Sequence, residues 1–234
     1  MAKKSISGCN YSLVRPTELL PITRHLSYPL TLILLKLPVS PNQVTALSLT
    51  FGLIGAMFFC IGTRYASILG GVLLIICYTL DNCDGEIARQ KKLSSEWGAQ
   101  FDDFSDWLVD GAFFTSLGYG VYTATSDLIW FWFGLAATVG ATIDYLIDLG
   151  FHSKTNQNPV SQNREQLAMG KRKPEDFTDW MIYIFHKLSR ADFCIIVFGL
   201  AMFNLTWVLL PLGAIGAQLY WITDLFQRSR GWHT

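Results

Sequence analysis

Six apolar stretches, separated by polar or turn-forming residues, recur along the 234-residue chain and constrain its fold more than any other feature. They cover residues 44–62, 66–89, 98–122, 128–151, 190–204 and 207–226. All but one have the roughly 20 residues that a helix needs to cross about 30 Å of hydrocarbon. With 51% hydrophobic and 15% charged residues, the composition is also too apolar for an ordinary soluble domain. The sequence therefore predicts an all-α, polytopic membrane protein with six transmembrane helices.

Two segments depart from this simple pattern. The stretch 190–204 is short, so its helix must begin earlier or lie close to its neighbours. Ahead of the first span, residues 26–37 are apolar for only about a dozen positions and contain Pro29, which indicates an amphipathic helix lying in the membrane interface. We therefore expect two parts, an N-terminal segment with an interfacial helix over 1–40 and a six-helix membrane domain over 41–234.

The basic residues predict the orientation of the chain in the membrane. If the N-terminus is cytoplasmic, 17 of the 18 lysines and arginines lie in cytoplasmic segments or at cytoplasmic helix ends, and Arg64 alone lies outside. An even number of spans then places both termini and the polar loop 152–180 in the cytoplasm. The formal net charge is zero, so nothing in the charge favours nucleic acid as a partner.

Aspartates concentrate at the cytoplasmic ends of the second and third predicted spans. Asp81 and Asp84 are three residues apart on one helix face. Asp102 and Asp106 are four apart and share a face of the next helix. Both pairs lie at similar distances from a turn near Leu93, so the antiparallel helices should bring them face to face. Crowded carboxylates need cations to neutralise them, and their oxygens suit hard divalent ions. We expect one or two ions, Mg²⁺ first and Mn²⁺ as the alternative.

These acids are part of a longer motif. Residues 81–89 read Asp-Asn-Cys-Asp-Gly-Glu-Ile-Ala-Arg, and residues 98–106, after an eight-residue spacer, read Gly-Ala-Gln-Phe-Asp-Asp-Phe-Ser-Asp. The pattern resembles D-x-x-D-G-x-x-A-R-x8-G-x-x-x-D-x-x-x-D, the signature of the CDP-alcohol phosphotransferase (CDP-alcohol phosphatidyltransferase) family. All eight specified residues and the spacer match over a 26-residue window, which makes a chance match negligible.

The resemblance implies a reaction and a role for each matching residue. It implies transfer of a phosphoalcohol group, phosphatidyl or phospho-polyol, from a CDP-linked donor to an alcohol or phosphoalcohol acceptor at a membrane-lipid boundary, with release of CMP. The first three motif aspartates, Asp81, Asp84 and Asp102, would bind the metal. Asp106 would be the general base and would also touch a metal. The residues implied to bind CDP are Gly85, Ala88, Arg89 and Gly98, with Asn42 and Thr45 at the start of the first span.

The partners are less closely defined than the reaction. The donor is either CDP-diacylglycerol or a CDP-polyol, and a homodimer with its active site on the cytoplasmic side is expected. Arg190 begins the fifth span at the cytoplasmic boundary, and its guanidinium could donate two hydrogen bonds to a phosphate group of the acceptor. Lys171 and Lys173, with Arg172 between them, are further acceptor candidates, although anchoring by the positive-inside rule also explains them.

Several alternatives stay open from the sequence. A cation transporter or channel would also carry intramembrane carboxylates, but such proteins usually spread them over both halves of the chain. The motif acids could instead be helix ends that face cytoplasmic water or pair with nearby cations. Asp144 and Asp148, four residues apart on the fourth span, either bind acceptor hydroxyls or simply end a helix. Asp110 extends the row of acids on the third span but lies outside the motif, so a role in supporting the metal ligands or in helix packing is favoured over ligation.

Overall fold

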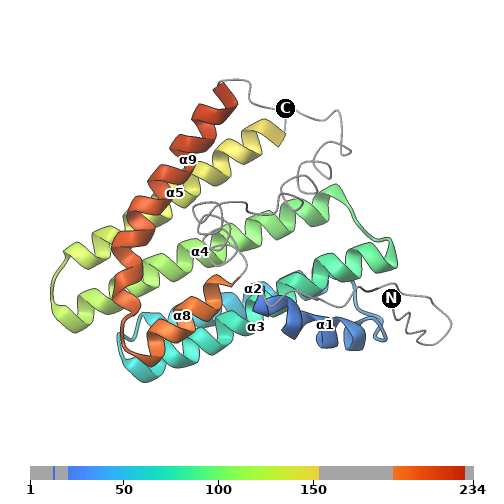
Figure 1. Cartoon of the computed structure of the whole chain (residues 1–234), viewed down its shortest axis with the longest axis horizontal. Helices are drawn as coiled ribbons and strands as arrows, with labels where there is room; N and C mark the ends of the chain where they lie inside the picture. The colour runs from blue at the N-terminus through green and yellow to red at the C-terminus, as the bar shows by residue number, and fades with distance from the viewer. Residues whose placement is uncertain (1–12, 14–20, 153–191, 230–234) are drawn as a thin grey trace, which may run out of the picture.

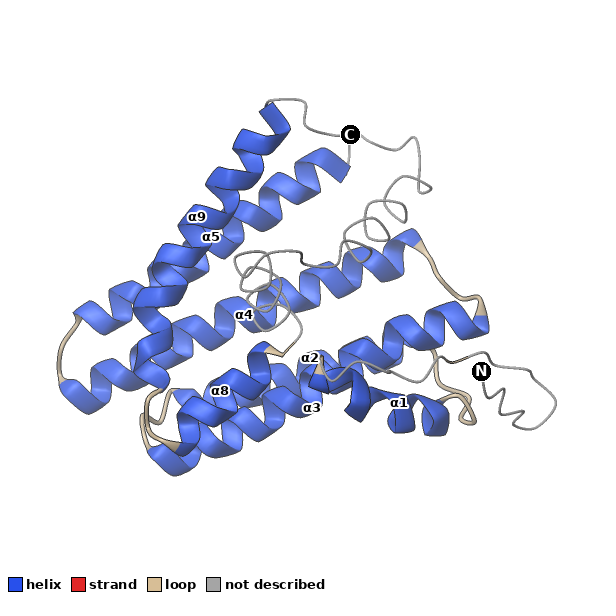
Figure 2. Cartoon of the chain, in the orientation of Figure 1, coloured by secondary structure: helices blue, strands red, loops and turns tan. Residues whose placement is uncertain are grey.

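The computed structural model describes residues 13, 21–152 and 192–229, and within these residues all regular structure is helical (Figures 1 and 2). The helices are α1 (Ile22–Leu34), α2 (Pro41–Phe59), α3 (Arg64–Lys91), α4 (Glu96–Thr125), α5 (Ile129–His152), α8 (Phe193–Met202), the 3-10 helix η1 (Thr206–Val208) and α9 (Leu209–Ser229). The all-α prediction is confirmed. Lys171, Lys173, Arg190 and the loop predicted after His152 lie outside the described residues.

Six of these helices occupy the six stretches that the sequence predicts to cross the membrane. Three of them, Pro41–Phe59, Arg64–Lys91 and Ile129–Gly150, are long and apolar enough to cross by length and composition. The 30-residue α4 is long enough but carries a row of acids. The 10 described residues of α8 would extend about 15 Å, too little for a crossing. The protein is an integral membrane protein, and the number of six spans stays a prediction.

Local sequence signals fix the ends of the helices near the acidic motif. A capping box opens α2, because the Ser40 hydroxyl accepts from Gln43 N and the Gln43 side chain accepts from Ser40 N. Near the start of α2, α3 stops at Lys92, whose φ of 57° is left-handed. Ser95 then caps α4 by accepting from Gly98 N at 3.0 Å. The turn therefore falls at 92–95, where the sequence predicts it.

The helix α2 lies between α3 and α4 and separates them. It packs against both, whereas α3 and α4 make few close contacts with each other (Figure 1). Gly52 permits this arrangement, since a Cβ there would lie 2.5 Å from Val109 Cγ2 on α4 and 2.9 Å from the Cys77 sulfur on α3. The acidic faces of α3 and α4 still meet through side chains, as predicted for Asp81, Asp84 and Asp102, although α2 keeps the two backbones apart. The space between them is bridged by side chains.

The remaining helices extend this three-helix unit on two sides. On one side α8 packs against α3, where a Cβ on Gly71 would lie 3.1 Å from Phe198 Cα. On the other side α5 packs against α4 and α9, and Figure 1 shows α5 and α9 side by side, away from α8. Phe113 of α4 contacts both Phe59 of α2 and Phe193 of α8 through edge-on ring contacts, so the main core joins both sides.

The first helix, α1, runs along the C-terminal part of α3 with an unusual distribution of side chains. Its fully buried residues all carry hydroxyls and repeat every fourth position: Thr23, Ser27 and Thr31. Its exposed side chains combine the apolar Ile22, Leu26 and Ile33 with the basic Arg24 and His25. A mixed apolar and basic outer face suits a helix that lies in the membrane interface. The placement of α1 in the membrane interface stays a prediction.

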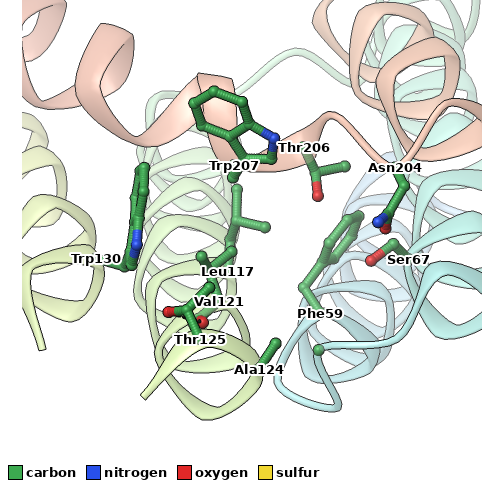
Figure 3. A pocket seen from close by; sticks show the side chains of 11 residues that line it. Phe59, Ser67, Leu117, Val121, Ala124, Thr125, Trp130, Asn204, Thr206 and Trp207 are labelled. Carbon is green, nitrogen blue, oxygen red and sulfur yellow. Dashed lines mark hydrogen bonds between the residues drawn. The ribbon is translucent and has the colours of Figure 1, made fainter. Parts of the chain in front are cut away.

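A cavity of about 280 Å³ lies at the end of the bundle opposite the α3–α4 turn (Figure 3). It is bounded by the ends of α2 and α4, the starts of α3 and α5, and η1. Trp130 and Trp207 contribute two of its walls, and Phe59 and Leu117 contribute apolar surface between them. No carboxylate lines this cavity, so it is separate from the acidic motif.

Candidate metal centre

Three aspartates converge in the space between α3 and α4. One carboxylate oxygen from each of Asp81, Asp84 and Asp102 lies within 4.8 Å of the other two. Two of these residues stand one turn apart on α3, and the third reaches across from α4. Oxygens bound to a common Mg²⁺ at about 2.1 Å are roughly 3 to 4 Å apart, so small side-chain adjustments would place these three around one ion.

The hydrogen bonding of these carboxylates supports a cation at this place. The Oδ1 atom of Asp102 is buried and accepts no hydrogen bond from the described part of the chain. Asp84 is only 4% exposed. A buried carboxylate oxygen without a donor is costly, and a bound cation removes that cost. The residues present therefore fit a divalent ion, and an all-oxygen donor set favours Mg²⁺ or Mn²⁺ over softer metals.

Thr45 holds one of these aspartates in place. Its hydroxyl donates to Asp84 Oδ2 across the contact between α2 and α3. The threonine is itself buried, one turn into α2, and also lies 3.2 Å from the Pro41 carbonyl oxygen. The sequence places Thr45 among the CDP-binding candidates. In the structure it contacts a candidate metal ligand, which ties the position of α2 to the metal centre.

The other CDP-binding candidates surround the same site. Asn42 on α2 and Gly98 on α4 are neighbours, because a Cβ on Gly98 would lie 3.1 Å from Asn42 Oδ1. On α3 the guanidinium of Arg89 lies over Gly85, with Nη1 3.3 Å from where a Cβ would stand. Ala88 is half-buried on the same helix. The two glycines thus let the Arg89 guanidinium and the Asn42 side chain lie close to the helices that carry the acids.

Two further acids of α4 have different surroundings. Asp106 stands one turn beyond Asp102, is exposed, and does not belong to the group of three converging oxygens. Its roles as general base and as an additional metal ligand stay predictions. Asp110, one turn further, accepts from the Tyr78 hydroxyl at 3.4 Å and so links α4 to α3. This contact agrees with the helix-packing role that the sequence favours.

The sequence leaves open that nearby lysines or arginines neutralise the acids, and the structure argues against Lys91 in that role. The Lys91 ammonium donates to the carbonyl oxygens of Leu37 and Val39, at 2.9 and 2.8 Å, and so points toward the end of α1. The proposed acceptor residues Lys171, Lys173 and Arg190 lie outside the described residues.

Comparison with known proteins adds the family. A family model described as CDP-alcohol phosphatidyltransferase matches residues 38–219. A bifunctional IPC transferase and DIPP synthase of Thermococcus kodakarensis is 33% identical over 106 residues, which are 45% of this chain and 23% of that protein. A phosphatidylinositol phosphate synthase of Streptomyces avermitilis is 34% identical over 86 residues, 37% of this chain and 34% of that protein. The matches thus span about a quarter to a third of these relatives.

A solved structure has the same fold. The crystal structure of phosphatidylinositol phosphate synthase from Mycobacterium tuberculosis with CDP-DAG bound superposes with a TM-score of 0.53 and 20% sequence identity. The superposition covers 83% of this chain and 90% of that one. Because the likeness extends over most of both chains, the helical arrangement described above is that of a known membrane fold.

Proposed function

This chain belongs to the CDP-alcohol phosphatidyltransferase family, and we propose that it transfers a phosphoalcohol group from a CDP-linked donor to an alcohol acceptor and releases CMP. The observation that carries the proposal is the convergence of Asp81, Asp84 and Asp102 within 4.8 Å. These are the first three aspartates of the motif. They stand on two separate helices, so the motif forms one site and not merely a sequence pattern.

The reaction joins an acceptor hydroxyl to the phosphorus that carries the donor's alcohol. Divalent ions held by the three aspartates would neutralise charge on the diphosphate and on the departing CMP. Asp106, exposed one turn from Asp102, takes the hydroxyl proton as the acceptor oxygen attacks. The new phosphorus–oxygen bond forms while the bond to the CMP oxygen breaks, which leaves a phosphodiester.

The surroundings of the acids suit a nucleotide diphosphate. We propose that Asn42, Gly85, Ala88, Arg89 and Gly98 contact the CDP group. The exposed guanidinium of Arg89 lies beside the acids and offers paired donors to a phosphate. Thr45 contributes indirectly, because its hydroxyl donates a hydrogen bond to Asp84 and so holds a candidate metal ligand in place. Gly85 leaves room for the Arg89 guanidinium, and Gly98 leaves room for the Asn42 side chain, so both proposed nucleotide contacts depend on a glycine.

The substrates follow from the setting of the site. We propose CDP-diacylglycerol as the donor and a polyol phosphate as the acceptor, since the fold relative holds CDP-DAG and the Streptomyces avermitilis relative is named for phosphatidylinositol phosphate. A lipid donor and a water-soluble acceptor would meet at the membrane boundary. We further propose that the site and both termini face the cytoplasm, that residues 41–234 form the membrane domain, and that the protein is a homodimer.

A substrate panel tests this function. Purified protein in lipid nanodiscs would receive CDP-diacylglycerol or CDP-polyols with free or phosphorylated polyols, and CMP release would be measured with Mg²⁺ and with EDTA. We expect CMP only when donor, acceptor and metal are all present. Cation flux into vesicles without CMP release would favour the transporter that the sequence leaves open. Hydrolysis of the donor without an acceptor would indicate a different enzyme.

Gly98→Ala should weaken donor binding. The added methyl would lie 3.1 Å from Asn42 Oδ1 and 3.0 Å from Ser95 Oγ. The Asn42 side chain, which we place against the nucleotide, would therefore have to shift. Alanine favours the helix over glycine, which acts against the cost of shifting the Ser95 cap, so we expect the variant to stay folded. We expect the donor KM to rise by roughly 10-fold with a smaller change in kcat. Gly199→Ala on α8 is the matched control, because a Cβ there meets nothing within 4 Å. Equal kinetics for both variants would contradict the placement of the nucleotide.

Arg190→Ala should weaken binding of a phosphorylated acceptor. An arginine at the start of the fifth span can form two hydrogen bonds to a phosphate, and alanine removes both. We expect the acceptor KM to rise by about 10-fold or more, equivalent to about 1.4 kcal/mol, while the donor KM changes far less. Lys187→Ala, which removes a cation three residues earlier, is the control. Unchanged acceptor kinetics would leave Arg190 as a membrane anchor.

A further inference from the structure

A fully buried carboxylate, that of Asp192, holds the first turn of α1 from 170 residues away in the sequence. Its Oδ2 accepts from Ile22 N at 2.8 Å, and its Oδ1 accepts from Thr23 N at 3.0 Å and from Thr23 Oγ1 at 3.1 Å. The residue that precedes α1 is Pro21, which makes no side-chain cap. Asp192 thus caps α1 in place of a local residue, and a negative charge is favoured at that helix end.

The same residue begins α8. Its backbone carbonyl accepts from Ile195 N at 2.9 Å and from Ile196 N at 3.3 Å, in the first turn of that helix. Since α8 packs against α3 through Phe198 and Gly71, the side chain of Asp192 connects α1 to a helix that is already fixed on α3. The start of α1 therefore has a defined position relative to the membrane core.

Further along, α1 is bonded to the part of α3 that carries the motif acids. Thr31 Oγ1 donates to Glu86 Oε2 at 2.6 Å, and the Cys83 thiol lies 3.6 Å from the Ser27 carbonyl oxygen. Cys83 and Ile87 are fully buried in the cluster that joins α1, α2 and α3. Cys83 immediately precedes Asp84 in the sequence. Movement of α1 would therefore displace the segment of α3 that holds the metal ligands.

The attachment of α1 near Asp192 depends on directional bonds. The buried face of that half of the helix is made of Thr23 and Ser27, while Ile22 and Leu26 point outward. Apolar residues of α1 join a hydrophobic cluster only in its second half, near Leu30 and Leu35. The first half of α1 therefore buries little apolar surface against the bundle, and hydrogen bonds must hold it there.

We propose that Asp192 is a positioning residue for the metal centre. Its carboxylate fixes the first turn of α1, and α1 in turn holds the segment of α3 that carries Asp81 and Asp84. For its effect on turnover this inference rests on the proposed function, but its effect on metal affinity does not. Residues that orient metal ligands through such contacts commonly change metal affinity when they are altered.

Binding of Mn²⁺ to the full-length purified protein tests the proposal without any substrate. Free Mn²⁺ would be measured by electron paramagnetic resonance for the parent protein, Asp192→Asn and Thr23→Val, each checked for monodispersity. Asn keeps the size of the side chain but offers one acceptor oxygen instead of two, so we expect Mn²⁺ affinity to fall by about 10-fold. Thr23→Val removes one of the three bonds and should weaken Mn²⁺ binding in the same direction by less. Thr23→Ser keeps the hydroxyl and should bind Mn²⁺ as the parent does.

A matched control separates positioning from helix capping in general. Asp127 also caps a helix, since its Oδ1 accepts from Ile129 N at 3.1 Å, but it is exposed at the far end of the bundle. Asp127→Asn should leave Mn²⁺ affinity unchanged. Folded Asp192→Asn and Thr23→Val proteins with parental Mn²⁺ affinity would overturn the inference, as would a parent protein that binds no Mn²⁺. A parent that binds Mn²⁺ yet transfers nothing from CDP donors would instead contradict the proposed function alone.

Discussion

Asp84→Asn should reduce kcat/KM by at least about 1,000-fold, equivalent to about 4 kcal/mol of transition-state stabilisation. The side chain is 4% exposed, accepts a hydrogen bond from Thr45 and lies with Asp81 and Asp102 around the candidate metal centre. An amide removes the charge of one ligand and replaces one of its oxygens with a donor, which a divalent ion cannot use. Steady-state CMP release at saturating Mg²⁺ measures the effect.

The control for this substitution is another acid of the same region. Asp103→Asn removes a negative charge next to Asp102, but Asp103 is exposed and outside the group of converging oxygens. It should therefore retain turnover within about 10-fold, since the three converging carboxylates stay intact. If Asp84→Asn were no more impaired than Asp103→Asn at saturating Mg²⁺, the three aspartates would not be the metal ligands.

Asp106→Asn should lower kcat by roughly 100- to 10,000-fold and leave donor affinity close to that of the parent. Asparagine is similar in size but cannot take the proton of the acceptor hydroxyl. Because proton transfer belongs to the transition state, binding of the donor in the ground state should change little. Single-turnover rates and equilibrium binding of a CDP donor measure the two effects separately.

The next acid on the same helix face provides the comparison. Asp110→Asn alters a residue that bonds to Tyr78 and lies farther from the turn, so we expect a far smaller effect on kcat. A loss of donor affinity in Asp106→Asn as large as its loss of turnover would indicate that Asp106 acts mainly as a metal ligand. In that case the base would have to be sought elsewhere.

Helix positions follow from the sequence more accurately than helix ends. The first span is predicted at 44–62, whereas α2 runs over Pro41–Phe59. Hydropathy marks the apolar residues, but the helix begins where Ser40 caps it and Pro41 supplies a suitable φ. It ends before Gly62, whose positive φ of 67° belongs to the connection to α3. Polar caps and turns lie outside what an apolar window detects.

Three of the four acids that the sequence predicts to meet come together in the structure. Counting residues from the turn places Asp84 and Asp102 at one height, and the structure brings them together with Asp81. The count says nothing of the distance between the two helices, which is set by the contacts of α2 at Gly52. It also pairs Asp106 with Asp81, although Asp106 lies outside the group in the structure.

The contact between Asp192 and Thr23 could not be predicted from local patterns, because 169 residues separate the two. The sequence marks Asp192 only as an acid at the start of a short apolar stretch. The available signal is the recurrence of Thr23, Ser27 and Thr31 at every fourth position, which identifies a polar helix face. Such a face indicates buried acceptors somewhere in the fold without identifying them.

The most direct test of the proposed reaction follows the donor phosphorus. CDP-diacylglycerol labelled with ³²P in the phosphate next to the diacylglycerol would be incubated with the purified protein, a polyol phosphate and Mg²⁺. We predict that the label appears in a phosphodiester with the acceptor, that one unlabelled CMP forms for each product molecule, and that EDTA stops both until Mg²⁺ is restored. Label found in CDP or in free phosphatidate, or transfer that persists in EDTA, would contradict metal-dependent phosphoalcohol transfer by this protein.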